Sequence, residues 1–152
     1  MLTVTQIGPD DDLERLTNQI NQAAWDEANE ISNYDPVSLA AYIDCQDTLF
    51  VVCHDVTTSG STLMGMASCR FEIKPYGQER WLYVDEVDVC ADQRQKGAGK
   101  AIMLKLIELA EAADCEEVWL GTEADNDAAN ALYRSLKPDD IGEVVGYTFE
   151  IS

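Results

Sequence analysis

The sequence is poor in basic residues. Its 152 positions hold 10 Lys and Arg side chains against 29 Asp and Glu, which gives a formal net charge of −19 at pH 7. A field of this sign repels nucleic acids and anionic membranes, so we expect neither as a partner, and it attracts cationic ligands. A second interpretation stays open: the acidic side chains coat the whole surface for solubility or for high salt, because composition does not show whether charge is clustered.

The chain also lacks the patterns of disulfide and metal frameworks. There is a single histidine, His54, in an apolar run, and five cysteines without any CxxC pair stand at positions 45, 53, 69, 90 and 115. An odd and widely spaced set predicts free, mostly buried thiols rather than a disulfide framework or a zinc site. We therefore expect no metal, and we expect a structural role for His54.

Long hydrophobic runs are missing as well. None approaches the roughly 20 residues that a membrane-spanning helix needs. The first residues, MLTVTQIGPDDD, have neither the basic nor the apolar region of an export signal, so we expect a soluble, cytoplasmic protein. Because no repeat or linker divides the chain, the sequence predicts one domain over residues 1–152.

The spacing of apolar residues predicts a mixed α/β fold. Alternation of apolar and polar residues is typical of strands, and a spacing of three to four residues is typical of helices. The strands are expected over 2–7, 48–56, 62–73, 81–89, 118–121 and 146–151, with a hairpin loop at 57–61. The helices are expected after the acidic turn 10–12, from Asp35-Pro36 onward, over 102–113 and over 128–136. The order is β-α-α-β-β-β-α-β-α-β.

A loop between a strand and a helix carries the clearest functional signal. In residues 87–110 the expected strand leads through Gly97 and Gly99 directly into a helix. Glycines let the backbone approach a ligand closely, and a helix N-terminus offers unpaired N–H groups to an anion. Three of the ten basic residues gather here: Arg94, Lys96 and Lys100. The pattern is neither GxGxxG nor a P-loop, so it predicts a different kind of diphosphate cradle.

The stretch Arg94-Gln95-Lys96-Gly97-Ala98-Gly99 resembles motif A, [Q/R]xxGx[G/A], of the GNAT acetyltransferases. The resemblance implies the GNAT fold, a mixed central sheet flanked by helices, and acetyl-CoA as co-substrate. It implies that the loop from Arg94 to Lys100 holds the pyrophosphate of coenzyme A. It also implies that Val87 and Val89, on the preceding strand, contact the arm that carries the thioester.

A second segment matches the same family. The run from Asn126 to Tyr133 is similar to the family's N-x-x-A-x-x-L-Y segment, which implies that Asn126 contacts the pantetheine arm and that Tyr133 faces the coenzyme sulfur. A phenol with a pKa near 10 is protonated at neutral pH, so Tyr133 suits the role of an acid for the leaving thiolate. The family's usual Gly-Phe turn after this tyrosine is absent, and Arg134-Ser135 stand in its place.

The attacking amine must lose a proton, which calls for a carboxylate on or beside the central strand. Asp85, Glu86 and Asp88 are the candidates. Simple alternation places Glu86 and Asp88 on one face of the strand and Asp85 on the other with Val87, and a bulge would break that parity. We favour Glu86 as the base, acting directly or through water.

At finer grain the chain looks most like the aminoglycoside 3-N-acetyltransferases, which implies an acceptor with several ammonium groups. The resemblance implies that Asp85 and Glu86, with the acidic residues Glu123, Asp125 and Asp127, contact this acceptor. Two alternatives remain open: a polyamine or peptide N-terminal amine as acceptor, and a non-catalytic module that only binds an acyl-CoA. Many relatives are dimers, so the resemblance also implies a homodimer.

Overall fold

The computed structural model describes residues 1–93 and 96–152, without the side chain of Gln93. These residues form two compact units, Met1–Leu120 and Gly121–Ser152. The first unit contains every strand of the described chain: β1 (Leu2–Gln6), β2 (Thr48–Thr57), β3 (Gly60–Ile73), β4 (Arg80–Val89) and β5 (Glu117–Leu120). Its helices are α1 (Leu13–Gln22), α2 (Pro36–Asp44) and α3 (Ala98–Ala112), with short 3-10 turns η1 (Glu27–Asn29) and η2 (Ala91–Gln93).

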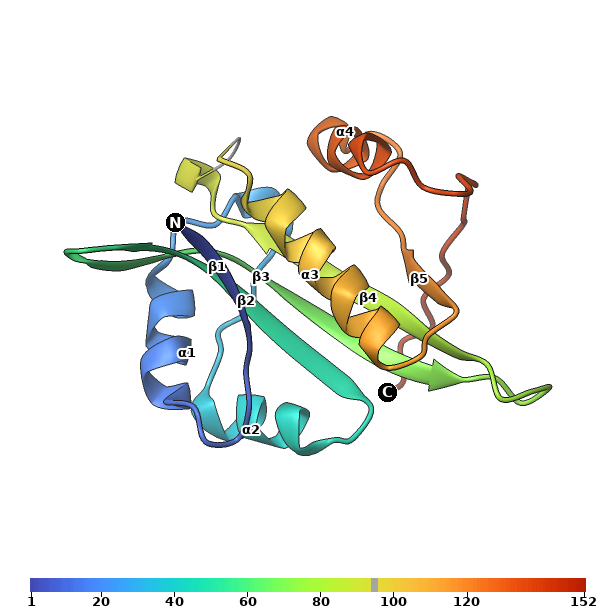
Figure 1. Ribbon diagram of the computed structural model, residues 1–152, viewed down its shortest axis with the longest axis horizontal. Coiled ribbons are helices and arrows are strands. Elements are labelled where there is room, and N and C mark those ends of the chain that lie inside the picture. Colours follow the sequence, from blue (N-terminus) through green and yellow to red (C-terminus); the bar gives the residue numbers. More distant parts are fainter. Residues whose placement is uncertain (94–95) are drawn as a thin grey trace. The chain divides into compact units, whose positions relative to one another are not determined.

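The five strands form one mixed sheet in the order β1-β2-β3-β4-β5 (Figure 1). β1 to β4 pair antiparallel with their neighbours. β5 pairs parallel with β4, which requires the crossover that α3 provides. The mixed α/β fold expected from the sequence is therefore confirmed for the first unit.

Aspartate caps begin the first two helices where the sequence predicts them. The Asp12 side chain accepts a hydrogen bond from the Arg15 amide at 3.1 Å, and Asp35 accepts one from the Ser38 amide at 2.8 Å. Each cap satisfies an N–H group that the helix itself cannot pair. The helices then present apolar residues to the sheet, and together they bury the cluster Ile7, Leu16, Ile20, Leu39, Phe50, Val52, Leu63 and Met66.

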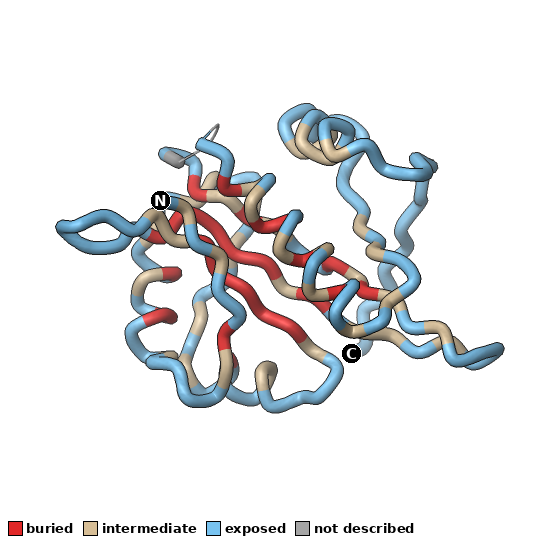
Figure 2. Tube along the Cα trace, viewed as in Figure 1, coloured by how far each residue is buried: buried red, intermediate tan, exposed pale blue. Residues whose placement is uncertain are grey.

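α3 covers the opposite face of the sheet, where it crosses the strands (Figures 1 and 2). Consecutive strand residues point to opposite faces. Met66 belongs to the cluster under α1 and α2, whereas a side chain on the preceding Gly65 would lie 3.1 Å from Cδ1 of Ile102 in α3. Ile102 and Leu106 are fully buried, and each contributes about 1.5–3 kcal/mol by burial.

Gly65 is the point where β3, β4 and α3 come closest, so Gly65→Ala is expected to destabilise the protein by about 1–3 kcal/mol. The new Cβ would lie 2.6 Å from the backbone oxygen of Asp88, and backbone atoms cannot move aside cheaply. Chemical denaturation measures the loss. Gly142→Ala is the matched control, because nothing lies within 4 Å of its Cβ position. Equal stability of the two variants would contradict this packing.

The second unit contains one helix, α4 (Asp127–Ser135), and no strand. The strand expected over 146–151 is therefore wrong. Its alternating apolar side chains, Tyr147, Phe149 and Ile151, are exposed by 81%, 84% and 94%. Alternation makes a segment suitable for one face of a sheet, but a strand also needs a neighbouring backbone to hydrogen-bond with, and none pairs with this segment.

Two boundaries differ from the expectation in the first unit. The loop expected at 57–61 is a tighter turn, because Thr57 and Gly60 are already paired, and Gly60 adopts a φ of 142° that glycine tolerates. α3 begins at Ala98, four residues before the first residue expected, Ile102. In the described part of the chain, no helix is both long and apolar enough to cross a membrane.

Candidate functional site

A bulge in β4 arranges the acidic side chains of this strand. Ser68 of β3 pairs with Glu86, and the next residue, Cys69, pairs with Val84. Asp85 is therefore an extra residue with no counterpart on β3. A bulge of this kind bends the strand and redirects side chains, and bulges are frequent next to active sites.

The bulge corrects the parity expected for Asp85. Simple alternation places Asp85 opposite Glu86, on the face of Val87. Instead, the Asp85 carboxylate contacts the guanidinium of Arg70, with Nε to Oδ2 at 3.1 Å, on the face of Ser68 and Glu86. Asp85 raises the pKa of Arg70 by this hydrogen bond and by its charge. The charge of Asp85 is thus already balanced by a cation within the protein.

Glu86 and Asp88 lie on the same face of β4, as alternation predicts, and their side chains are hydrogen-bonded to each other. Glu86 is exposed, whereas Asp88 is only 8% exposed. Among the described residues, Oδ2 of Asp88 has no hydrogen-bond partner. Burial, then the charge of Glu86 and the hydrogen bond to it, raise the pKa of Asp88 from 3.8 to about 7.

Tyr34 approaches this carboxyl pair from the segment between η1 and α2. Burial and then the charges of Glu86 and Asp88 raise the pKa of Tyr34. Asn21 of α1 holds the backbone of Tyr34 at both ends: its Oδ1 accepts from the Tyr34 amide at 2.8 Å, and its Nδ2 donates to the Tyr34 carbonyl at 2.7 Å. Sequence reasoning assigned no role to Tyr34 or Asp88. No local pattern marks Tyr34, whereas Asp88 stands out as an acid between Val87 and Val89.

The end of β4 that follows the bulge has an edge that β5 does not pair. Pairing between the two strands runs from Trp81 with Glu117 to Val84 with Leu120, and stops there. Val87 and Val89 lie beyond that point, half-buried, on the face opposite Glu86. Their backbone groups on the β5 side are positioned to bond an extended ligand, as an added strand would be bonded.

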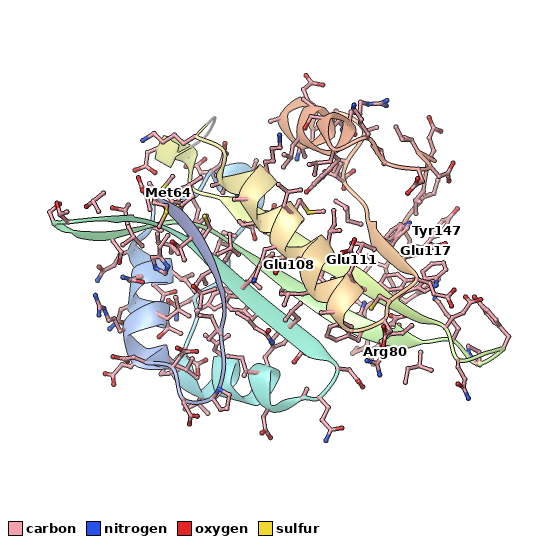
Figure 3. The ribbon with its side chains drawn as sticks, viewed as in Figure 1. Met64, Arg80, Glu108, Glu111, Glu117 and Tyr147 are labelled. Carbon is pink, nitrogen blue, oxygen red and sulfur yellow. The ribbon has the colours of Figure 1, made fainter. Side chains whose placement is uncertain are left out.

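Figure 3 helps to locate this end of the sheet. Met64 of β3, which is labelled there, accepts a hydrogen bond from the amide of Cys90, the residue after β4, at 2.9 Å. Arg80, also labelled, begins β4 at the opposite end. The carboxyl pair therefore lies toward the Met64 end of the strand, where β4 leads through η2 into the expected coenzyme loop.

The N-terminus of α3 follows that loop. Gly97 is the N-cap with a φ of 89°, a left-handed conformation, and no side chain caps the helix there. Ala98, Gly99 and Lys100 form the first turn, whose N–H groups have no partner within the helix. Lys96 is exposed beside them, and Arg94 and Gln95 lie outside the described residues. Such a terminus suits a phosphate.

The remaining expected residues belong to the second unit. Asn126 is the N-cap of α4, and its side chain accepts a hydrogen bond from the Ala129 amide at 3.1 Å. Tyr133 lies on α4 and is half-buried. The acidic residues Glu123, Asp125 and Asp127 are exposed in and beside the turn that precedes this helix. Asn126 thus has a capping role, and its expected contact with the coenzyme stays a prediction.

His54 and the cysteines stand outside this arrangement. His54 Nε2 is 3.2 Å from Oε1 of Gln19, and burial lowers the pKa of His54. All five cysteines are free, and Cys53, Cys69 and Cys90 are buried. Within residues 1–93 and 96–152, no group of three or more His, Cys, Asp or Glu side chains is arranged to hold a metal ion.

The comparisons agree with this geometry. The chain belongs to the acetyltransferase (GNAT) family, whose model matches residues 11–137. It is therefore an acetyltransferase, and enzymes of this family generally use acetyl-CoA. A comparison with curated proteins by sequence gives no match.

Several solved structures share the fold. The aminoglycoside acetyltransferase meta-AAC0020 from an uncultured soil metagenomic sample, in complex with sisomicin, has a TM-score of 0.83 at 18% identity, over 99% of this chain and 97% of that chain. A second soil metagenomic aminoglycoside acetyltransferase, HMB0005, has a TM-score of 0.79 at 17% identity, over 100% and 99%. A ribosomal-protein-alanine N-acetyltransferase from Brucella melitensis biovar Abortus 2308 has a TM-score of 0.67 at 16% identity, over 97% and 100%.

Proposed function

We propose that this chain transfers the acetyl group of acetyl-CoA to a primary amine of a cationic small molecule, with an aminoglycoside as the acceptor class and its 3-amino group as the target. The observation that carries the proposal is the carboxyl pair of Glu86 and Asp88 beside the open edge of β4. The family model spans residues 11–137 and so crosses the division between the two compact units, which supports one acetyltransferase domain over residues 1–152.

The coenzyme would lie between the open edge of β4 and the N-terminus of α3. The first-turn amides of α3, with the loop from Arg94 to Lys100, would hold the pyrophosphate, because unpaired amides and the helix dipole both favour an anion. The backbone at Val87 and Val89 would bond the pantetheine arm, and Asn126 would contribute from the start of α4. These assignments place the acetyl group near the bulge of β4.

Each residue of the reaction has a proton to move. Glu86 would take a proton from the ammonium of the acceptor, so that the nitrogen lone pair can attack the acetyl carbonyl carbon. Tyr133 would donate its phenolic proton to the leaving sulfur as the carbon–sulfur bond breaks. Glu86 suits its role because it is exposed to an incoming ligand and lies beside the point where β4 leaves β5.

The acidic residues would select the acceptor. An ammonium in contact with a carboxylate near the protein surface gains on the order of 1–4 kcal/mol. Glu86 has no basic partner in the described structure, whereas Asp85 is paired with Arg70, so Glu86 would contribute more of this attraction than Asp85. Glu123, Asp125 and Asp127 would add further carboxylates. Two of the fold neighbours are aminoglycoside acetyltransferases, which supports an acceptor with several amines.

A peptide or polyamine amine is the second candidate acceptor. It is supported by the fold neighbour that acetylates a ribosomal-protein alanine. A module that only binds an acyl-CoA is less well supported, because such a module has no need for a base beside the open edge of β4.

Release of free coenzyme A from acetyl-CoA tests the proposal. Kanamycin-type and gentamicin-type aminoglycosides are compared with spermidine and a peptide N-terminal amine, each at low and high salt. We expect the aminoglycosides to be turned over most efficiently, and their KM to rise with salt because screening shortens the reach of the acidic field to about 8 Å at physiological ionic strength. Turnover of the peptide or spermidine alone would reject the aminoglycoside, and no turnover at all would favour the binding module.

Gly97→Val is expected to weaken acetyl-CoA binding about tenfold or more. A β-branched residue in the left-handed conformation costs about 1–3 kcal/mol, and relaxing that strain would turn the first amides of α3 away from the pyrophosphate. Calorimetric titration of acetyl-CoA measures the change. Gly142→Val is the control, because its Cβ position is open and lies far along the chain from the loop. Unchanged affinity in Gly97→Val would remove this helix terminus from the coenzyme site.

A further inference from the structure

We propose that Asp88 holds a proton that it donates to Glu86, so that the two carboxyl groups act as one proton-sharing pair and Asp88 is the positioning residue for the base. The proposal rests on the proposed role of Glu86 in acetyl transfer. It assigns a function to a buried acid that the reaction as described above does not use.

The contact between the two side chains requires a proton. Glu86 and Asp88 are two residues apart on one strand, and both point to the face of Ser68 because the bulge lies before them, at Asp85. Their side chains are hydrogen-bonded. An ionised carboxylate can only accept, so a hydrogen bond between two carboxyl groups exists only while one of them is protonated.

Burial decides which of the two keeps the proton. Asp88 is 8% exposed and pairs across the sheet with the apolar Met66, whereas Glu86 is exposed to water. If Asp88 were ionised, its Oδ2 would be a buried charged oxygen without a hydrogen-bond partner among the described residues. Such a charge is costly in a buried place, so Asp88 is the donor and Glu86 the charged acceptor.

The surroundings supply no compensating cation. The titratable groups that act on the pair are Glu86 itself, on β4, and Tyr34, from the segment before α2. Arg70, on the same face of β3, is engaged by Asp85 and Glu72, with Nη1 to Oε1 of Glu72 at 3.3 Å. Nothing in the described structure therefore opposes the retention of a proton by Asp88.

The shared proton has two consequences for Glu86. The hydrogen bond from Asp88 fixes the direction of the Glu86 carboxylate, which leaves its other lone pairs for the ammonium of the acceptor. It also stabilises the charged form of Glu86 and makes it a weaker base. When Asp88 loses its proton to water, the pair becomes doubly negative, and Glu86 both attracts the ammonium more strongly and accepts its proton more readily.

Asp88→Asn tests the kinetic part, because the amide keeps a donor for Glu86 and has no proton to lose. We measure kcat/KM for a kanamycin-type acceptor from pH 5.5 to 8.5 at saturating acetyl-CoA. The loss in the variant is expected to grow with pH and to be about tenfold larger at pH 8 than at pH 6. A merely structural role would give a loss of equal size at every pH, and that result would overturn the proposal.

Carboxyl ¹³C NMR of the free protein, labelled at aspartate, supplies a readout that needs no acetyl transfer. One aspartate signal is expected to titrate near pH 7, to vanish in Asp88→Asn, and to titrate at lower pH in Glu86→Gln. If every aspartate titrates below pH 5, the shared proton does not exist. If no amine is acetylated but the signal near pH 7 is present, the proposed function fails and the carboxyl pair stands, so the two failures are distinguishable.

Discussion

Glu86→Gln is expected to lower the turnover of a cationic amine by about 10²-fold or more, the scale typical of a lost general base. Glutamine keeps the size of the side chain and can still hydrogen-bond with Asp88, but it neither accepts a proton from the ammonium nor carries a charge that attracts it. The KM of the acceptor should therefore rise as well. Steady-state release of coenzyme A measures both parameters, and calorimetry should show an almost unchanged affinity for acetyl-CoA.

Glu108→Gln is the matched control for this variant. Glu108 lies on α3, on the other side of the sheet from Glu86, where Figure 3 shows it on the outer surface of the helix. Its one ion pair in the described structure is with Lys105 at 3.5 Å, and exposed pairs of this kind contribute little. Turnover in Glu86→Gln equal to that of Glu108→Gln would show that Glu86 is not the base.

Asp88→Asn is expected to make the folded protein less sensitive to pH. The pKa of Asp88 is raised from 3.8 to about 7 in the folded state, so folding is favoured while Asp88 is protonated, and this contribution is lost as the pH rises from about 4 through 7. At about 1.4 kcal/mol for each pH unit between the two pKa values, the loss approaches about 4 kcal/mol. Asparagine stays neutral and does not incur it.

The measurement is the free energy of unfolding of both proteins in denaturant from pH 4 to pH 8. The difference between variant and wild type should grow in favour of the variant across this range, most steeply between pH 4 and pH 7. Asp10→Asn serves as the control, because Asp10 is exposed in the turn before α1 and should leave the shape of the profile unchanged. A difference independent of pH would mean that Asp88 is as easily ionised in the folded state as in the unfolded one.

Much of the first unit could be predicted from local patterns. Asp35-Pro36 announces α2 because a cap and a first-turn proline act within one turn of the chain, and the strands from β1 to β5 follow from apolar spacing. The same reasoning failed at 146–151, where alternation was present and a paired neighbour was not. It also missed the true start of α3 at Ala98, because Gly97 works as a left-handed cap rather than as part of a longer loop.

The candidate site shows the same division. The residue types and their order place a base, a coenzyme loop and an acid along the chain, since Glu86, the stretch 94–100 and Tyr133 can each be read from their immediate neighbours. The pairing of Asp88 with Glu86 could not be read in this way. It depends on how deeply the sheet and the segment of Tyr34 bury one carboxyl group and leave the other exposed.

The sequence by itself thus determined the class of protein, the mixed α/β order and the motif that leads into α3, because these depend on side-chain chemistry over a few residues. Only the tertiary structure decided that the bulge at Asp85 turns this residue toward Arg70, that β4 leaves β5 after Val84, and that Asp88 is enclosed beside Glu86. Register and burial are set by contacts between strands and helices far apart in sequence, and it is burial that changes the chemistry of a carboxyl group.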